Sequence, residues 1–231
     1  MGFFRTGQAR VVDAVVGCPK NGGMNLTDAA GLPFELTAEG DPPLECHADG
    51  NTLVLRGGAH SDLFVDPAGD GPQLDAGRLL GTPPAGDFAL SARVSVDFAS
   101  RYDAGVILVY VDTVHWAKLC FEYSPQNQPT VVSVVTRGSS DDCNSFEVAG
   151  DSVWLRVARS GRAYAFHAST DGAWWRLVRY FALDGSASAA SAASAARLGF
   201  EAQSPTGQGC TARFDDVTFT RDVPVDLRDG S

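Results

Sequence analysis

The sequence predicts an all-β protein, built as an antiparallel sandwich or barrel. About a dozen alternating segments follow one another at spacings of roughly 10–14 residues, and no helical segment separates them. Ser160-Gly161 and Asp171-Gly172 stand between such segments and are typical of hairpin turns. The acidic residues are 22 Asp and only 6 Glu, and Asp favours turns over helix interiors.

The first strands are expected to be short, at 34–37, 44–48 and 52–56. Residues 57–86 are expected to form a loop, because Gly and Pro clusters there end any regular element. The Ala/Ser-rich stretch 186–196 is interpreted as either a single exposed helix or a flexible loop.

Longer strands are expected after residue 86. In 88–98 alternate residues are apolar, whereas 105–111 is apolar throughout, as in a strand that is covered on both faces. Further strands are expected at 115–124, 130–137, 153–159, 163–169, 174–181, 197–203 and 211–220.

The chain is expected to hold one large domain. We divide it into an N-terminal extension (1–24), a β-sandwich (25–221) and a C-terminal tail (222–231). The extension differs in charge from the rest and precedes Met24, a possible start; the alternative is a short strand at 9–16.

Composition excludes several classes of protein. The 231 residues carry a formal net charge of −10, which argues against a nucleic-acid partner because such proteins need a basic surface. No run approaches the length of a membrane span, and the N-terminus does not read as a secretory signal. The five Cys are widely spaced, so we expect a cytoplasmic protein with free thiols.

Strand alternation predicts a polar face. In 115–124, Ala117, Leu119 and Phe121 form an apolar face. The opposite face of this strand and the outward faces of other strands carry Trp116, Lys118, Glu122, Arg156, His167, Glu201 and Gln203. We interpret these residues as one polar groove with aromatic platforms, suited to a sugar; the alternative is an ordinary solvated sheet face.

Glu122 and Glu201 are the candidate acid/base pair, because two facing carboxylates can cleave a glycosidic bond. Lys118 is a candidate for a Schiff base or, more simply, for a salt-bridged lysine of the groove. Cys120 and Cys143 are interpreted as buried thiols rather than nucleophiles.

No cofactor is expected, although a structural Ca²⁺ is conceivable at two oxygen-rich sites. These are Asp141-Asp142-Cys143-Asn144 and Asp215-Asp216, for which turn-capping Asp is the alternative.

Several motifs in order resemble one known family. They are WAKLCFEYS at 116–124, VVSVVTRGSSDDCNS at 131–145, WLRVARSG at 154–161, FHASTDGAWWRLVRYF at 166–181, GFEAQSPTGQGC at 199–210 and FDDVTF at 214–219. Together they resemble the regulation-of-enolase protein family, a largely uncharacterised group of intracellular concanavalin A-like proteins. The resemblance runs from about residue 24 to residue 220, and the N-terminal extension and the Ala/Ser stretch depart from it.

The resemblance implies a two-sheet antiparallel jelly-roll sandwich with a concave face that binds sugars in better-known relatives, and it implies no established reaction. The family positions carried onto this chain are Trp116, Lys118, Glu122, Arg137, Asp141, Asp142, Asn144, Arg156, His167, Glu201 and Gln203.

We therefore expect a binding module for a carbohydrate, sugar phosphate or similar small molecule. Trp116 would stack on the ligand, and Glu122, Glu201 and Gln203 would accept hydroxyl protons. The four groups expected to donate or to bind an anion are Lys118, Arg137, Arg156 and His167, which favours an acidic ligand. The alternatives are an enzyme on the same scaffold, a glycan hydrolase or an isomerase/cyclase using Glu122 or Glu201, and a structural interaction protein. An oligomer is possible.

Overall fold

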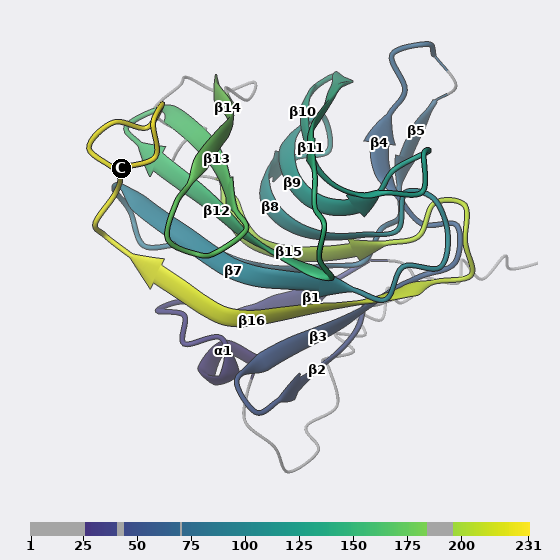
Figure 1. The fold of residues 1–231 in the computed structure, drawn as a ribbon, viewed down its shortest axis with the longest axis horizontal. Coiled ribbons are helices and arrows are strands. Elements are labelled where there is room, and N and C mark those ends of the chain that lie inside the picture. The colour runs from purple at the N-terminus through teal and green to yellow at the C-terminus, as the bar shows by residue number, and fades with distance from the viewer. Residues whose placement is uncertain (1–25, 41–43, 70, 184–195) are drawn as a thin grey trace, which may run out of the picture.

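A computed structural model describes residues 26–40, 44–69, 71–183 and 196–231. Two large antiparallel sheets of seven strands each dominate the molecule, and a two-stranded hairpin forms a third, small sheet (Figure 1). The expected all-β jelly-roll sandwich is therefore confirmed, and the described chain does not close into a barrel.

The first sheet has the strand order β1-β6-β15-β8-β9-β10-β11. Its strands are β1 (Thr37–Glu39), β6 (Arg78–Gly81), β15 (Arg197–Gln203), β8 (Ala104–Asp112), β9 (His115–Tyr123), β10 (Pro129–Arg137) and β11 (Ser139–Glu147).

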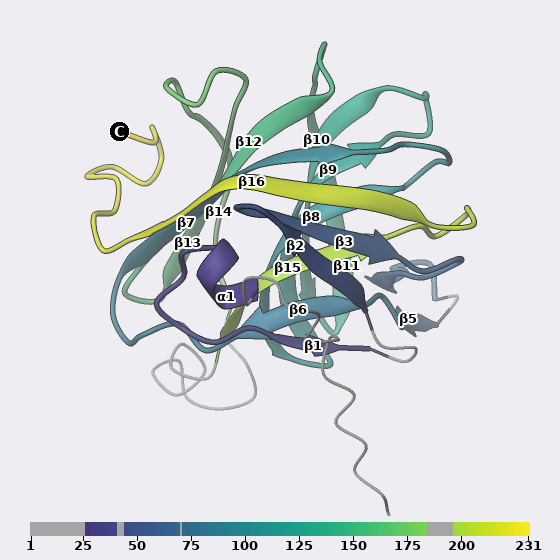
Figure 2. The same cartoon turned by 90° about the horizontal axis from the view of Figure 1, so that it is seen from below.

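The second sheet has the order β14-β13-β12-β7-β16-β3-β2. Its strands are β14 (Arg176–Ala182), β13 (Ala163–Ser169), β12 (Ser152–Ser160), β7 (Phe88–Val96), β16 (Cys210–Thr220), β3 (Thr52–Gly57) and β2 (Glu45–Asp49). The one-turn helix α1 (Leu26–Ala29) lies near β2 and β3 (Figure 2).

The main core lies between the two sheets. Leu119 and Phe121 of β9 are fully buried there, as the alternation of the sequence predicts, and so are Leu155 and Val157 of β12. Such large buried side chains each contribute about 1.5–3 kcal/mol relative to exposure, so this layer dominates the folding energy.

A second, smaller core covers the other face of the first sheet. The hairpin of β4 (Leu63–Val65) and β5 (Pro72–Leu74) lies over this face, where the buried Leu63 packs in one cluster with Val106 and Trp116. The backbone N–H of Val65 donates to the hydroxyl of Ser140 in β11 at 2.9 Å, so the hairpin also contacts the edge of the sheet.

Two sequence-based expectations for the elements were wrong. Residues 57–86 were expected to be a loop but contain β4, β5 and β6, which are only three or four residues long and so give no alternating pattern. No strand was expected at Ser139–Glu147; β11 is exposed along most of its length and therefore carries no apolar signal.

Other boundaries moved slightly. The strand expected at 34–37 begins at Thr37, and the one expected at 174–181 begins at Arg176. The extension 1–24 and nearly all of the stretch 186–196 lie outside the described residues. No helix in the described ranges is both long and apolar enough to cross a membrane.

Candidate functional site

The candidate site lies on the face of the first sheet that the β4–β5 hairpin covers. Figure 1 shows β8 to β11 curving around this face, which we call the concave face. Glu122 of β9 and Gln203 of β15 both stand opposite Ala104 of β8, between them. Glu201 stands opposite Val106 and Lys118 opposite Leu108, and directly opposed residues share one face of a sheet. Strand order therefore brings these four polar side chains together.

Lys118 is the centre of this cluster. Its side chain is 2% exposed, and its ammonium donates to Gln203 Oε1 at 2.8 Å and to Asp62 Oδ1 at 3.2 Å. Burial alone would lower the pKa of Lys118, but attraction to Asp62 and Glu201 outweighs burial, and the pKa is raised. The lysine is therefore a permanent cation that holds the cluster together.

Glu201 is fully buried, and neither of its carboxylate oxygens has a hydrogen-bond partner among the described residues. Burial raises the pKa of Glu201 to about 7, although Lys118 opposes the rise. Glu122 is 8% exposed, and burial raises its pKa to about 8. Two carboxyl groups that exchange protons near neutral pH thus share one face, an arrangement often found at functional sites.

Trp116 does not present an open stacking platform. It is fully buried under the hairpin, and its ring stacks on that of Tyr110 with centroids 6.5 Å apart. Its indole Nε1 is buried without a hydrogen-bond partner in the described chain. In this conformation the indole N–H of Trp116 can donate a hydrogen bond towards the concave face, but its ring is not exposed for stacking.

Three predicted groove residues lie elsewhere. Arg156 is in β12 and His167 in β13, both strands of the second sheet. Arg137, at the end of β10, is exposed and donates to the carbonyl of Ala182 at 2.8 Å. The expectation of one shared groove was therefore wrong for these residues, because strand alternation does not say which sheet a strand joins.

The charge of the concave face differs from the expectation as well. An acidic ligand was expected because of four cationic groups. Of those four only Lys118 is in the cluster, where Asp62, Glu122 and Glu201 oppose it and Arg78 of β6 adds a second positive charge beside Glu201. Above about pH 8, where Glu122 and Glu201 are ionised, the cluster is therefore net negative, which disfavours a phosphorylated or acidic ligand.

Asp141 and Asp215 of the oxygen-rich motifs form ion pairs with arginines, whereas Asp142 lies on the concave face and acts electrostatically on Lys118 and Glu122. Asp141 and Asp142 are consecutive in β11, so their side chains point to opposite faces, and Asp141 pairs with Arg179 at 2.8 Å. Asp215 pairs with Arg93 at 3.4 Å. In the described ranges, no group of three or more His, Cys, Asp or Glu side chains is arranged to hold a metal ion.

Cys120, Cys143 and Cys210 have free thiols. Cys120 faces the cluster between Lys118 and Glu122 and is fully buried, and burial raises its pKa well above the ordinary value. It is therefore a poor nucleophile, whereas Cys143, expected to be buried, is exposed on β11.

Sequence reasoning missed the residues that the hairpin and its base supply. Asp62 precedes β4, and its backbone N–H donates to Asp75 Oδ1 at 3.1 Å, so the two ends of the hairpin are joined. Arg78 of β6 stands directly opposite Glu201. A segment rich in Gly, Pro and Asp gave no sign that its acids were anything but turn residues.

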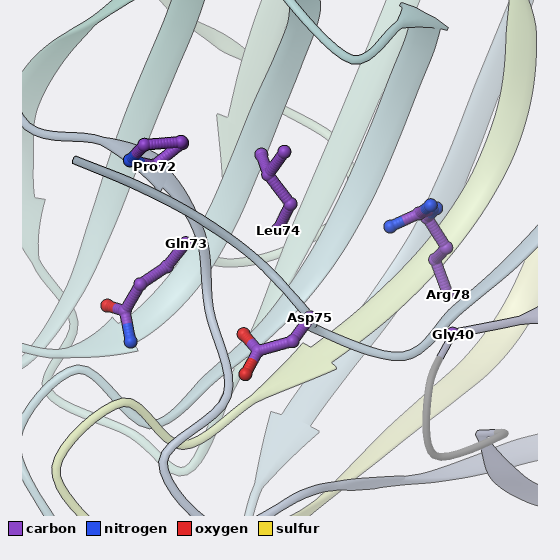
Figure 3. A pocket seen from close by; sticks show the side chains of 6 residues that line it. All are labelled: Gly40, Pro72, Gln73, Leu74, Asp75 and Arg78. Atoms are coloured by element: carbon purple, nitrogen blue, oxygen red, sulfur yellow. The ribbon is translucent and has the colours of Figure 1, made fainter.

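Two hollows flank the base of the hairpin. The larger one measures about 630 Å³ and is lined by Leu74, Asp75 and Arg78 together with Gly40, Pro72 and Gln73 (Figure 3). The smaller one measures about 270 Å³, and Asp75 and Ser61 line it. Because Arg78 is the register neighbour of Glu201, the larger hollow lies on the β6 side of the buried cluster.

A family model and one curated protein match the sequence of this chain. The model of the family described as "Protein of unknown function (DUF1349)" matches residues 41–222. The Saccharomyces cerevisiae protein named "Regulation of enolase protein 1" is 34% identical over 108 residues, which cover 46% of this chain and 53% of that relative. The chain thus matches about half the length of that protein.

Solved structures share the fold. A functionally unknown protein from Saccharomyces cerevisiae has a TM-score of 0.67 and 21% identity, over 87% of this chain and 100% of that one. A xylan beta-1,4-xylosidase from Bacillus halodurans C-125 has a TM-score of 0.58 and 14% identity, over 74% of this chain and 33% of the xylosidase.

Proposed function

This chain belongs to the DUF1349 family, and we propose that its concave face binds a small hydroxyl-rich molecule, a carbohydrate or a compound resembling one. The ligand would meet Glu122, Glu201, Gln203 and Lys118 beneath the β4–β5 hairpin. The hairpin would have to move aside for the ligand to enter, because these four residues are buried in the present conformation.

One observation carries the proposal: Glu201 is fully buried, and both of its oxygens lack a hydrogen-bond partner in the described chain. Burying a carboxyl group without a partner costs about 1–3 kcal/mol or more, so natural proteins retain such a group mainly where it serves a purpose. Hydroxyl groups of a sugar would supply the missing donors to Glu201 and Glu122.

The site is held in place from two directions. Lys118 anchors Gln203 on one side and Asp62 of the hairpin on the other, so the cover and the floor share one ion pair. Among the described strands, β4 and β5 pair with each other and form no ladder with the two large sheets. Movement of the hairpin would therefore break side-chain contacts and the Lys118–Asp62 pair but no β-ladder of the large sheets.

A solved structure of similar fold suggests the first probes. Because a xylan xylosidase contains a region of similar fold, xylose, xylobiose and xylotriose are suitable ligands for isothermal titration calorimetry, with glucose and arabinose beside them.

The test compares the natural chain with Glu122→Gln and Glu201→Gln. Each variant keeps the shape of the side chain and replaces one carboxyl oxygen by an NH2 group that cannot accept a hydrogen bond, so we expect affinity to fall by about 10- to 100-fold. Glu45→Gln, which changes an exposed carboxylate of β2, is the control and should bind as the natural chain does. Failure of every sugar to bind, or equal affinity in the two site variants, would refute the proposal.

A second candidate function is favoured by the raised pKa values of Glu122 and Glu201. Strand spacing places their Cα atoms roughly 12 Å apart on one face, and side chains turned towards each other would bring the carboxyl groups to the approximately 5–10 Å found in glycosidases. A carboxyl group with a pKa of about 7 or 8 can still act as a proton donor at neutral pH.

Hydrolysis of nitrophenyl xylosides tests this alternative. If the chain is such an enzyme, turnover decreases above about pH 7–8 as the acid loses its proton, and both Gln variants are inactive. Sugar binding without turnover would leave the binding module as the function.

A further inference from the structure

A second polar site lies on the outer face of the second sheet, far in sequence from the first. Arg156 of β12 and His167 of β13 stand directly opposite each other in the register. Their neighbours Leu155 and Phe166 point into the core, so Arg156 and His167 point outward. The chain after β16 turns back towards these strands (Figure 1), and Gly230 is buried against them.

Arg156 and His167 each donate a hydrogen bond to a backbone carbonyl of this C-terminal segment. Arg156 Nη2 donates to the carbonyl of Gly230 at 2.6 Å, and His167 Nε2 donates to the carbonyl of Leu227 at 2.8 Å. The guanidinium of Arg156 also lies over the ring of Trp175, 4.2 Å from its centroid.

These contacts leave Arg156 without a carboxylate partner, whereas Asp229 of the C-terminal segment acts electrostatically on His167. Arg156 forms no ion pair with any carboxylate in the described chain, and burial lowers its pKa to about 10. Arg156 Nε and His167 Nδ1 are both buried without hydrogen-bond partners there. A partly buried guanidinium that has only carbonyl partners is less well compensated than one paired with an anion.

We propose that Arg156 and His167 form a binding site for an oxyanion, a phosphate or carboxylate group, and that residues 227–230 cover this site in the present conformation. The carbonyl oxygens of Leu227 and Gly230 stand where two oxygens of the anion would accept the same hydrogen bonds. Guanidinium is the side chain best suited to planar, two-point recognition of such groups. This site is independent of the concave face and of the function proposed for that face.

Gly230 is the residue through which the cover can be removed. Its φ is +82°, which favours glycine, and a Cβ there would lie 3.2 Å from atoms of Arg156, His167 and Trp175. We therefore expect Gly230→Val to lift the segment without altering β12 or β13. Gly138→Val is the matched control, because Gly138 has a φ of +79° and open space around its Cβ position.

The experiment is calorimetric titration of the full chain with inorganic pyrophosphate and, separately, with succinate at constant ionic strength. A cover that is closed most of the time weakens apparent affinity, so Gly230→Val should bind at least about tenfold more tightly than the natural chain. Gly138→Val should match the natural chain, and adding Arg156→Gln to Gly230→Val should abolish the gain. Whichever anion shows this pattern identifies the type of oxyanion; the absence of a gain for both anions would overturn the proposal.

Hydrogen exchange of the natural chain tests the same idea if Gly230→Val fails to fold. Saturating pyrophosphate or succinate should accelerate amide exchange in residues 222–231, because the anion displaces their carbonyls, and Arg156→Gln should remove this effect. Unchanged exchange in the natural chain with both anions would show that the segment is a fixed part of the fold.

Discussion

Replacing the buried Glu201 by Gln is expected to change how the stability of the protein depends on pH. In the folded chain burial raises the pKa of Glu201 to about 7, from an ordinary value of 4.5. Between these values the folded state keeps a proton that the unfolded state has released, so stability falls as the pH rises through this window. The difference between the pKa values corresponds to about 3 kcal/mol, most of it lost between pH 5 and pH 8.

Urea unfolding at pH 5 and pH 8 measures this effect. At each pH the free energy of unfolding of the natural chain is subtracted from that of Glu201→Gln. This difference should be about 2–3 kcal/mol larger at pH 8 than at pH 5, because the variant has no proton to release. Glu45→Gln provides the control, since the Glu45 side chain is 80% exposed. An equal free-energy difference between Glu201→Gln and the natural chain at the two pH values would refute the claim that Glu201 is buried without compensation.

Three further predictions concern stability. Lys118→Met should cost about 3–5 kcal/mol in urea unfolding, because it leaves buried carboxylates without their cation; a loss below about 1 kcal/mol would contradict this role. Burial lowers the pKa of His167 to about 4 from its ordinary value of 6.5. The uncharged His167 therefore contributes about 3 kcal/mol to the free energy of unfolding above pH 6.5, and this contribution is lost as the pH falls through 4. His167→Gln should therefore flatten the stability curve between these pH values, and an unchanged slope would count against it. Gly199→Ala would place a Cβ 2.0 Å from the carbonyl oxygen of Leu79, so its Tm should fall by more than about 5 °C, and a Tm like that of the natural chain would show that β6 and β15 adjust.

The sequence and the structure assign different roles to Lys118. From the sequence, Lys118 is interpreted as a lysine of the polar groove. In the structure it is buried and bonded to Gln203 and Asp62, so its removal disturbs the site and the hairpin together. Binding assays on Lys118 variants are consequently harder to interpret than those on Glu122→Gln or Glu201→Gln.

Most of the long strands were predictable because their signal is local. Alternation along β9 separates Leu119 and Phe121, which enter the core, from Lys118 and Glu122, which do not, and this division holds in the structure. The short strands of the hairpin and the polar β11 were missed because neither has an alternating apolar pattern.

The sequence by itself determined the fold class and the side of each long strand on which a polar residue lies, since both follow from the two-residue repeat of a strand. The tertiary structure alone decided which polar sides meet. Order β15-β8-β9 joins Glu201 to Lys118, whereas Arg156 belongs to the other sheet. The tertiary structure also decided that the β4–β5 hairpin covers the cluster around Lys118 and that the C-terminal segment covers Arg156. Such pairings depend on hydrogen bonds and packing between residues distant in the chain, which a local pattern does not record.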